Sequence, residues 1–257
     1  MNLALFFEGT GQGVAGKRTN VTRIYEACSQ EDQKLHLEAG PGTHPWYYLS
    51  GKVAGRDWQK IFQSARRWFE SEYSLASIPT PQNYTSPKVF LFGFSRGALL
   101  ARHLAAWLDK LGIAVEYLGV WDTVDATPGL DVSEMCPTNV KRARHAVAEH
   151  EARRFFAYVP LTGEQVEEEL FPGVHSDVGG LYDDNHEYAD VACAWVVRPA
   201  LVAGLRLEHE LGCSESVNPL TAIRHDSQRL VSNLFGLLKP VTREFPEGMK
   251  RHCDLTP

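Results

Sequence analysis

The fold of this chain is decided by the stretch Lys88-Val89-Phe90-Leu91-Phe92-Gly93-Phe94-Ser95-Arg96-Gly97-Ala98-Leu99-Leu100-Ala101-Arg102. An apolar run typical of a buried strand passes through Gly-x-Ser-x-Gly directly into a helical pattern. Gly93 and Gly97 lack a Cβ, so the chain can turn sharply at Ser95 and present its hydroxyl above the end of the sheet. The backbone N–H of Arg96 would then face an oxyanion. We expect Ser95 to be a nucleophile, and the alternative is a tight turn that carries an idle hydroxyl.

The composition is that of an ordinary globular protein. The 257 residues are 44% hydrophobic and 23% charged, and they contain no low-complexity segment, charge block or internal repeat. This length fits one α/β domain, so we expect a single catalytic domain over residues 1–257. The formal net charge of −6 means that the chain has no excess of basic residues to attract phosphate groups, which argues against nucleic acid as a partner.

The cysteines and the N-terminal residues suggest a protein made in the cytoplasm. The five cysteines are scattered, odd in number and without Cys-x-x-Cys spacing, which argues against a disulfide framework and against a zinc site. We expect reduced thiols and neither a metal nor another cofactor. The chain begins almost at once with the apolar run Leu3–Phe7, so we expect no Sec-type signal. No apolar stretch approaches the ~20 residues of a transmembrane helix.

Strand patterns and helix patterns alternate along the chain. Strands are predicted over Leu3–Phe7, Leu35–Glu38, Val89–Phe92, Val115–Trp121, Arg154–Val159 and Glu168–Val174. Helices are predicted over Val21–Cys28, Trp58–Tyr73, Ala98–Leu111, Val140–Ala148 and Tyr188–Leu205. This order predicts an α/β fold with a mostly parallel, doubly wound sheet and helices on both faces, whose ligand crevice lies at the carboxyl ends of the strands.

A serine nucleophile needs a histidine to take its proton and a carboxylate to orient that histidine. Two pairs satisfy the order serine, acid, histidine along the chain. In the first pair, Asp177 follows the last predicted strand as the acid and His225 is the base. In the second pair, Asp122 follows the fourth predicted strand and His175 is the base. We favour the first pair, because the acid usually follows the strand two past the serine. The second pair remains an alternative.

A second oxyanion donor is expected from a glycine-rich loop after an earlier central strand. Glu8-Gly9-Thr10-Gly11 follows the first predicted strand, and Gly9 permits close backbone approach. We therefore expect the backbone around Gly9 and Thr10 to complete the oxyanion pocket with Arg96, although a structural turn would explain these glycines nearly as well.

Several blocks of the sequence resemble an uncharacterised α/β-hydrolase domain family that includes the type VI secretion phospholipase effectors. The blocks are Phe6–Thr10, Gly93–Ala98, Gly119–Val124, Arg144–Val147, Phe171–Gly180 and His225–Ser227. They extend over almost the whole chain and agree with Ser95, Asp177 and His225 as the catalytic set. The chain departs from the family pattern at Glu8, where Asp is usual, and at Leu181, which interrupts a glycine run.

The resemblance implies a cofactor-free serine ester hydrolase. Its substrate would be a phospholipid or another lipid ester, and its protein partners would be a secretion apparatus and a cognate immunity protein. Export by a type VI system is the route that the resemblance implies. The alternatives are a small soluble carboxylesterase or acyltransferase, and a non-catalytic interaction module on the same fold.

Overall fold

The central strands β1 (Asn2–Phe7), β3 (Lys88–Phe94) and β4 (Tyr117–Trp121) of this protein are short, mostly apolar and buried, as expected for strands that are covered on both sides. The computed structural model describes residues 1–10, 18–41, 57–76, 86–125, 127, 129–154, 156–218, 220–226 and 241–252. Within these residues the strands are β1 (Asn2–Phe7), β2 (Gln33–Glu38), β3 (Lys88–Phe94), β4 (Tyr117–Trp121), β5 (Ala143–Ala148), β6 (Val166–Phe171) and β7 (Lys250–Arg251). They form one sheet in the order β2-β1-β3-β4-β5-β6-β7, and every neighbouring pair is parallel.

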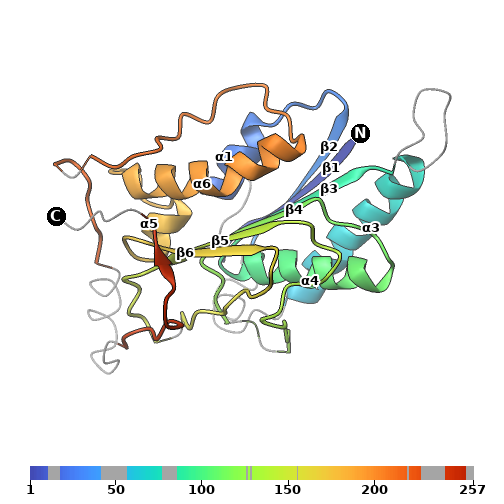
Figure 1. The fold of residues 1–257 in the computed structure, drawn as a ribbon. Coiled ribbons are helices and arrows are strands. Elements are labelled where there is room, and N and C mark those ends of the chain that lie inside the picture. Colours follow the sequence, from blue (N-terminus) through green and yellow to red (C-terminus); the bar gives the residue numbers. More distant parts are fainter. Residues whose placement is uncertain are drawn as a thin grey trace.

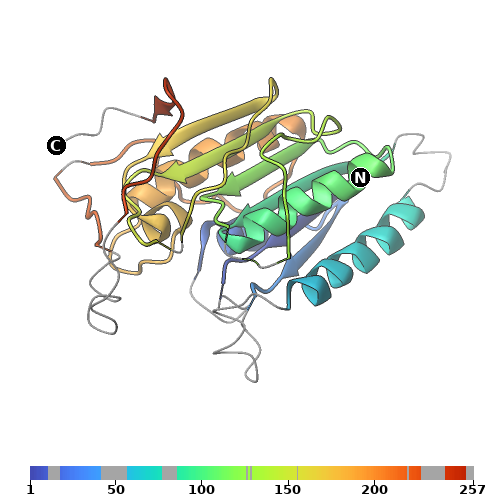
Figure 2. The same cartoon turned by 90° about the horizontal axis from the view of Figure 1, so that it is seen from below.

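Helices cover both faces of the sheet. They are α1 (Asn20–Ala27), α3 (Trp58–Ala76), α4 (Arg96–Lys110), α5 (His175–Gly179) and α6 (Glu187–Ala203). Figure 1 shows α1 and α6 on one face and α3 and α4 on the other, with α5 after β6 at the end of the sheet. In Figure 2, α3 and α4 run side by side across the near face. The result is a three-layer arrangement with a parallel sheet in the middle.

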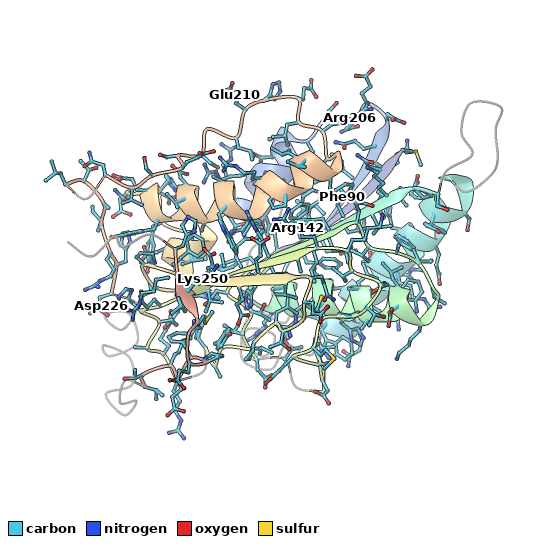
Figure 3. The ribbon with its side chains drawn as sticks, viewed as in Figure 1. Phe90, Arg142, Arg206, Glu210, Asp226 and Lys250 are labelled. Carbon is cyan, nitrogen blue, oxygen red and sulfur yellow. The ribbon has the colours of Figure 1, made fainter. Side chains whose placement is uncertain are left out.

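The core lies in two layers, one on each face of the sheet. Along β1, the side chains of Leu3, Leu5 and Phe7 join the apolar cluster under α3 and α4. Ala4 and Phe6 join the cluster under α1 and α6. This alternation follows from the two-residue period of a strand, and it explains why the run Leu3–Phe7 is apolar at every position. Figure 3 shows the two layers of side chains, with Phe90 of β3 among them.

The strand registers bring the residues that follow three strands to one edge of the sheet. β1 and β3 end nearly level, and β3 pairs with β4 up to Phe94 and Trp121. The next residues in the chain are Glu8, Ser95 and Asp122. Because parallel strands share a carboxyl end, these residues all lie at the edge where ligands bind in open α/β sheets.

Two predicted elements differ from the structure. The expected helix Val140–Ala148 is strand β5, which pairs with both β4 and β6. Of the expected strand Arg154–Val159, the described residues lie in a turn and loop, and Tyr158 forms an isolated bridge with Val124. In both places the pairing of the backbone with neighbouring segments decides the conformation rather than local composition. Among the described helices, none has the length and apolar character that a bilayer span requires.

Candidate active site

Ser95 occupies the sharp turn between β3 and α4. Its φ of 60° and ψ of −125° are rare for a residue with a Cβ. The turn is compact because glycine flanks it. A Cβ on Gly93 would lie 2.5 Å from the carbonyl oxygen of Gly97, and a Cβ on Gly97 would lie 2.2 Å from the carbonyl oxygen of Phe7. The Ser95 N–H donates to the carbonyl of Trp121 at 3.0 Å, which fixes the turn against β4.

Ser95, His175 and Asp122 form a continuous line of hydrogen bonds. His175 begins α5, and its Nε2 lies 2.9 Å from Ser95 Oγ. Its Nδ1 lies 2.5 Å from Oδ2 of Asp122, the residue directly after β4. A carboxylate only accepts hydrogen bonds, so Nδ1 carries the proton and Nε2 presents its lone pair to the serine hydroxyl. All three side chains are buried.

Arg243 holds the Asp122 carboxylate from the side opposite His175. Its Nη1 lies 2.7 Å from Oδ1 and its Nη2 lies 3.0 Å from Oδ2, so the contact is bidentate. The N–H of Ala148 donates to Oδ1 at 2.9 Å. Burial alone would raise the pKa of Asp122, but the Arg243 charge and the His175 hydrogen bond outweigh it and hold that pKa well below its usual range. Asp122 is therefore ionised at neutral pH.

His175 sits in an apolar, water-excluding setting. Its ring stacks on Phe94 with 4.5 Å between ring centroids and meets the edge of Phe156 at 4.8 Å. Burial lowers the pKa of His175, even though the hydrogen bond and charge of Asp122 raise it. The imidazole is consequently neutral near pH 7, which is the protonation state that a general base requires.

Asp177 and His225, the pair favoured from the sequence, form a separate contact. His225 Nδ1 lies 2.5 Å from Asp177 Oδ1, and Nε2 lies 3.1 Å from Asp184 Oδ1. Burial lowers the pKa of His225, but the two carboxylates outweigh it and the pKa is raised. A cationic ring that donates from both nitrogens has no lone pair for a serine proton. The preference for this pair is therefore corrected: the structure brings His175 and Asp122 to Ser95.

The geometry of α5 explains why His175 reaches Ser95 and Asp177 does not. His175 and Asp177 are two positions apart, which separates them by about 200° around a helix axis. When His175 faces Ser95, Asp177 faces away from it. The Asp177 carboxylate instead accepts from the N–H of Val174 at 2.8 Å and caps its own helix.

Two of the expected oxyanion residues, Gly9 and Arg96, lie beside the serine. A Cβ on Gly9 would lie 3.3 Å from the Cβ of Ser95, so the backbone after β1 passes directly by the turn. The Gly9 N–H donates to Glu8 Oε2 at 3.2 Å. Arg96 is the first residue of α4, where backbone N–H groups point out of the helix end. The buried Glu8 carboxylate also accepts from Thr19 at 2.7 Å, and burial raises its pKa.

Other buried polar residues fix the loops that carry the site, and sequence reasoning assigned them no role. His145 of β5 accepts a hydrogen bond from the N–H of Thr123 at 3.0 Å and contacts Glu168 of β6 at 2.6 Å. It therefore anchors the residue next to Asp122. The Glu151 carboxylate accepts from the N–H of His175 at 3.2 Å. No spacing in the sequence marks Arg243, which comes from the far C-terminal part of the chain. Among the described residues, no group of three or more His, Cys, Asp or Glu side chains is arranged to hold a metal ion.

Known proteins provide an independent comparison. A comparison with curated protein sequences finds no significant match. An uncharacterised protein from Pseudomonas aeruginosa is 18% identical with a TM-score of 0.58, covering 80% of this chain and 46% of that chain. The Tle1 effector bound to the VgrG spike of a type VI secretion system is 19% identical with a TM-score of 0.49, covering 71% of this chain and 51% of that chain. The RedJ thioesterase from Streptomyces coelicolor is 14% identical with a TM-score of 0.48, covering 77% of this chain and 90% of that chain.

The likeness to the first of these structures is a likeness of fold. This chain spans about half the length of the first two structures. Its parallel sheet, with the serine turn after β3, is an α/β-hydrolase-like fold. The family model for the type VI secretion, phospholipase effector Tle1-like catalytic domain matches residues 1–116 and 113–199. Because these two matches together span well over half of the sequence, this chain belongs to the Tle1-like phospholipase effector family, in its catalytic-domain part.

Proposed function

We propose that this chain is a serine ester hydrolase that cleaves lipid esters, with phospholipids as its substrate class. The observation that carries the proposal is the line of hydrogen bonds from Ser95 through His175 to Asp122, with Arg243 behind it. Membership of a phospholipase effector family supports the lipid substrate. Each element of the line has the protonation state that acyl transfer requires.

The proposed reaction begins with attack of Ser95 Oγ on the ester carbonyl carbon. The hydroxyl proton passes to His175 Nε2, and the buried Asp122 carboxylate stabilises the resulting imidazolium. The carbonyl oxygen becomes an oxyanion, held by the backbone N–H groups of Arg96 and Thr10. Thr10 is the proposed second donor because the Gly9 N–H is directed to Glu8. When the tetrahedral intermediate collapses, His175 returns the proton to the departing alcohol oxygen and Ser95 is left acylated.

Water completes the proposed cycle. His175 takes a proton from a water molecule, whose oxygen attacks the acyl carbon of the ester on Ser95. Collapse of the second tetrahedral intermediate breaks the bond to Oγ, and His175 returns the proton to Ser95. The free carboxylic acid leaves and the enzyme regains its first state. No step requires a metal ion or another cofactor.

We extend the proposal to delivery, because the family is one of type VI effectors. A component of the secretion apparatus would carry this chain out of the cell, as the solved Tle1 effector is bound to a VgrG spike. A cognate immunity protein would protect the producing cell. Pull-down of this chain with a VgrG spike protein would test the first of these partners.

The experiment that tests the chemistry is labelling with a fluorophosphonate probe, followed by peptide mass spectrometry. The wild-type chain should carry the probe on Ser95, and Ser95→Ala should carry none. His175→Gln should label at least about a hundredfold more slowly, because the serine loses its base. His225→Gln is the matched control, since it changes another histidine–aspartate pair, which is partly buried, and it should label at nearly the wild-type rate. Equal loss of labelling in the two histidine variants would contradict the proposed base.

The substrate class is tested separately. Wild-type protein should release fatty acid from phospholipid vesicles, and Ser95→Ala should release none. A preference for short water-soluble esters over vesicles would replace the phospholipase with a soluble carboxylesterase or acyltransferase. Absence of both labelling and turnover in well-folded protein would indicate a non-catalytic interaction module on the same fold.

A further inference from the structure

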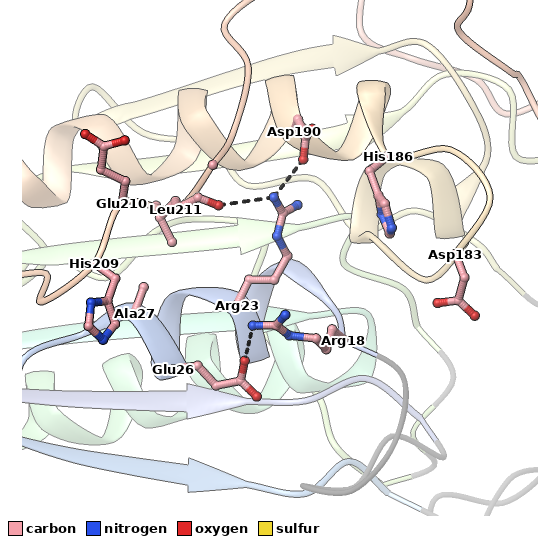
Figure 4. Close-up of a pocket in the computed structure, with 11 residues that line it drawn as sticks. Arg18, Arg23, Glu26, Ala27, Asp183, His186, Asp190, His209, Glu210 and Leu211 are labelled. Atoms are coloured by element: carbon pink, nitrogen blue, oxygen red, sulfur yellow. Dashed lines mark hydrogen bonds and ion pairs between the residues drawn. The ribbon is translucent and has the colours of Figure 1, made fainter.

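A second group of reactive side chains lies between α1, α6 and the segment that follows α6. Arg23 comes from α1, Cys193 and Asp190 come from α6, and Cys213 comes from the following segment. None of them contributes to the hydrogen bonds at Ser95. Figure 4 shows the Arg23 guanidinium pointing between Asp190 and the carbonyl of Leu211. The group therefore joins three elements of one face of the fold.

The two cysteines are in contact but differ in exposure. Cys193 is fully buried in the core layer under α6, while Cys213 is partly exposed and packs against the same layer. The two thiols interact, and this interaction raises the pKa of Cys193 and lowers the pKa of Cys213. Arg23 Nη2 lies 3.3 Å from Cys213 Sγ and 2.7 Å from Asp190 Oδ1. A positive charge thus lies directly against the more accessible sulfur.

A cavity leads to this group from the surface. Its volume is about 480 Å³, and Arg23, Asp190, Leu211 and Gly212 are among the residues that line it. Gly212 directly precedes Cys213 in the chain. A small polar oxidant such as a hydroperoxide can enter a cavity of this size and reach the Arg23 guanidinium.

We propose that Cys213 is a peroxide-sensitive thiol and that Cys193 converts its oxidised form into an intramolecular disulfide. In the first step the Cys213 sulfur attacks one oxygen of the hydroperoxide. The S–O bond forms, the O–O bond breaks, and the leaving oxygen takes a proton to become water or an alcohol. In the second step the Cys193 sulfur attacks the sulfenic sulfur of Cys213. The S–S bond forms, the S–O bond breaks, and the hydroxyl leaves as water. The two sulfurs together give two electrons to the peroxide.

The environment of each sulfur explains why Cys213 reacts first. The interaction with the Cys193 thiol and the nearby Arg23 charge lower the pKa of Cys213 despite partial burial. Burial raises the pKa of Cys28 to about 12 and that of Cys136 to about 11. The pKa of Cys193 is raised by its interaction with Cys213 and by complete burial. Cys213 is therefore the described cysteine with the most thiolate character.

The test uses the full chain with Cys253→Ser, because Cys253 lies outside the described residues. After treatment with hydrogen peroxide, the intact mass should fall by two hydrogens, and non-reducing peptide mapping should show Cys193 linked to Cys213. Cys193→Ala should stop the sequence at the sulfenic acid, which dimedone would trap on Cys213. Cys136→Ala is the matched control for loss of a buried cysteine and should leave the linkage unchanged.

Two arginine variants test the role of the charge. Arg23→Gln should slow oxidation of Cys213 by about tenfold, and Arg23→Lys, which keeps the charge, should retain most of the rate. Circular dichroism shows whether each variant is folded. If folded protein forms no Cys193–Cys213 linkage, or if Cys213 reacts no faster than Cys136, the proposal is overturned.

Discussion

Replacement of Arg243 by Gln should destabilise the fold strongly, because this residue neutralises a carboxylate in the core. In the ion pair the Arg243 side chain is 6% exposed and the Asp122 side chain is 0% exposed. Removing one partner of a buried ion pair leaves the other charge uncompensated and costs about 3–5 kcal/mol. Arg243 also donates to the carbonyls of Ala148 and Phe156, at 2.9 and 2.7 Å from its two terminal nitrogens. We therefore expect Arg243→Gln to lower the free energy of unfolding by an amount in the upper part of that range.

A double-mutant cycle separates the ion pair from general packing. Asp122→Asn alone leaves an unpaired guanidinium, so it should also be destabilising. The double variant should lose less than the sum of the two single losses, with a coupling energy of about 1–3 kcal/mol. The control is Arg198→Gln, whose partner Glu215 is exposed, with side chains 62% and 68% accessible. That exposed pair should contribute only about 0–1 kcal/mol.

The assay is urea unfolding followed by tryptophan fluorescence at several pH values. In the folded state the pKa of Asp122 is depressed, so its stabilising contribution is present above the unfolded pKa of about 4 and is lost as pH falls through the lower folded value. Without Arg243, the charge that opposes the effect of burial is lost, so the pKa of Asp122 should rise from its wild-type value. The difference in unfolding free energy between wild type and Arg243→Gln should therefore grow between pH 4 and about pH 7. A loss below about 1 kcal/mol, equal to that of Arg198→Gln and independent of pH, would refute the reasoning.

Three further predictions concern activity. His175→Gln should lower kcat by about a thousandfold or more, whereas His225→Gln should retain most activity; the reverse order in an ester-hydrolysis assay would contradict the assignment. The acidic limb of the wild-type pH–rate profile should have its midpoint below about pH 6.5, because the pKa of His175 is lowered and the base works only when neutral. A midpoint above that value would argue against His175. Gly9→Ala should lower kcat by about tenfold or more, since its Cβ would lie 2.8 Å from the Phe94 ring and 3.3 Å from Ser95 Cβ. Unchanged kinetics in the folded variant would show that the backbone around Gly9 is not part of the active site.

The serine turn could be predicted because everything it requires is local in the chain. The apolar strand, the two flanking glycines and the helix lie within fifteen residues, Lys88–Arg102. The structure has the strand, the turn and the helix in those places. The parallel sheet with helices on both faces also follows from the order of elements, which is a property of the whole sequence.

The error over β5 shows the limit of local composition. Ala143–Ala148 contains three alanines, and alanine favours helix by less than about 1 kcal/mol per residue over ordinary residues. In the fold this segment pairs with strands on both sides, and that pairing outweighs so small a preference. The pairing partners come from other parts of the chain, so the segment's own pattern cannot reveal them.

The choice between the two histidine–aspartate pairs depended on contacts that only the folded chain makes. His175 and Asp177 lie in a five-residue helix, too short to leave a periodic pattern in the sequence. Arg243 lies 121 positions after its partner Asp122. Sequence order allowed both pairs equally, so the preference rested on where the acid usually lies in such folds.

The surroundings of the two histidines explain why His175, and not His225, is the proposed general base. The His175 ring is hydrogen-bonded to one carboxylate, and that carboxylate is itself neutralised by Arg243, so burial prevails and the ring stays neutral. His225 contacts two carboxylates at a more exposed position, so the protonated ring is favoured. Arg243 therefore acts on His175, the proposed base, through Asp122. It keeps the Asp122 carboxyl group ionised and offsets the negative charge of that carboxylate. Without it, the carboxyl group of Asp122 would become protonated more readily and would orient His175 less firmly.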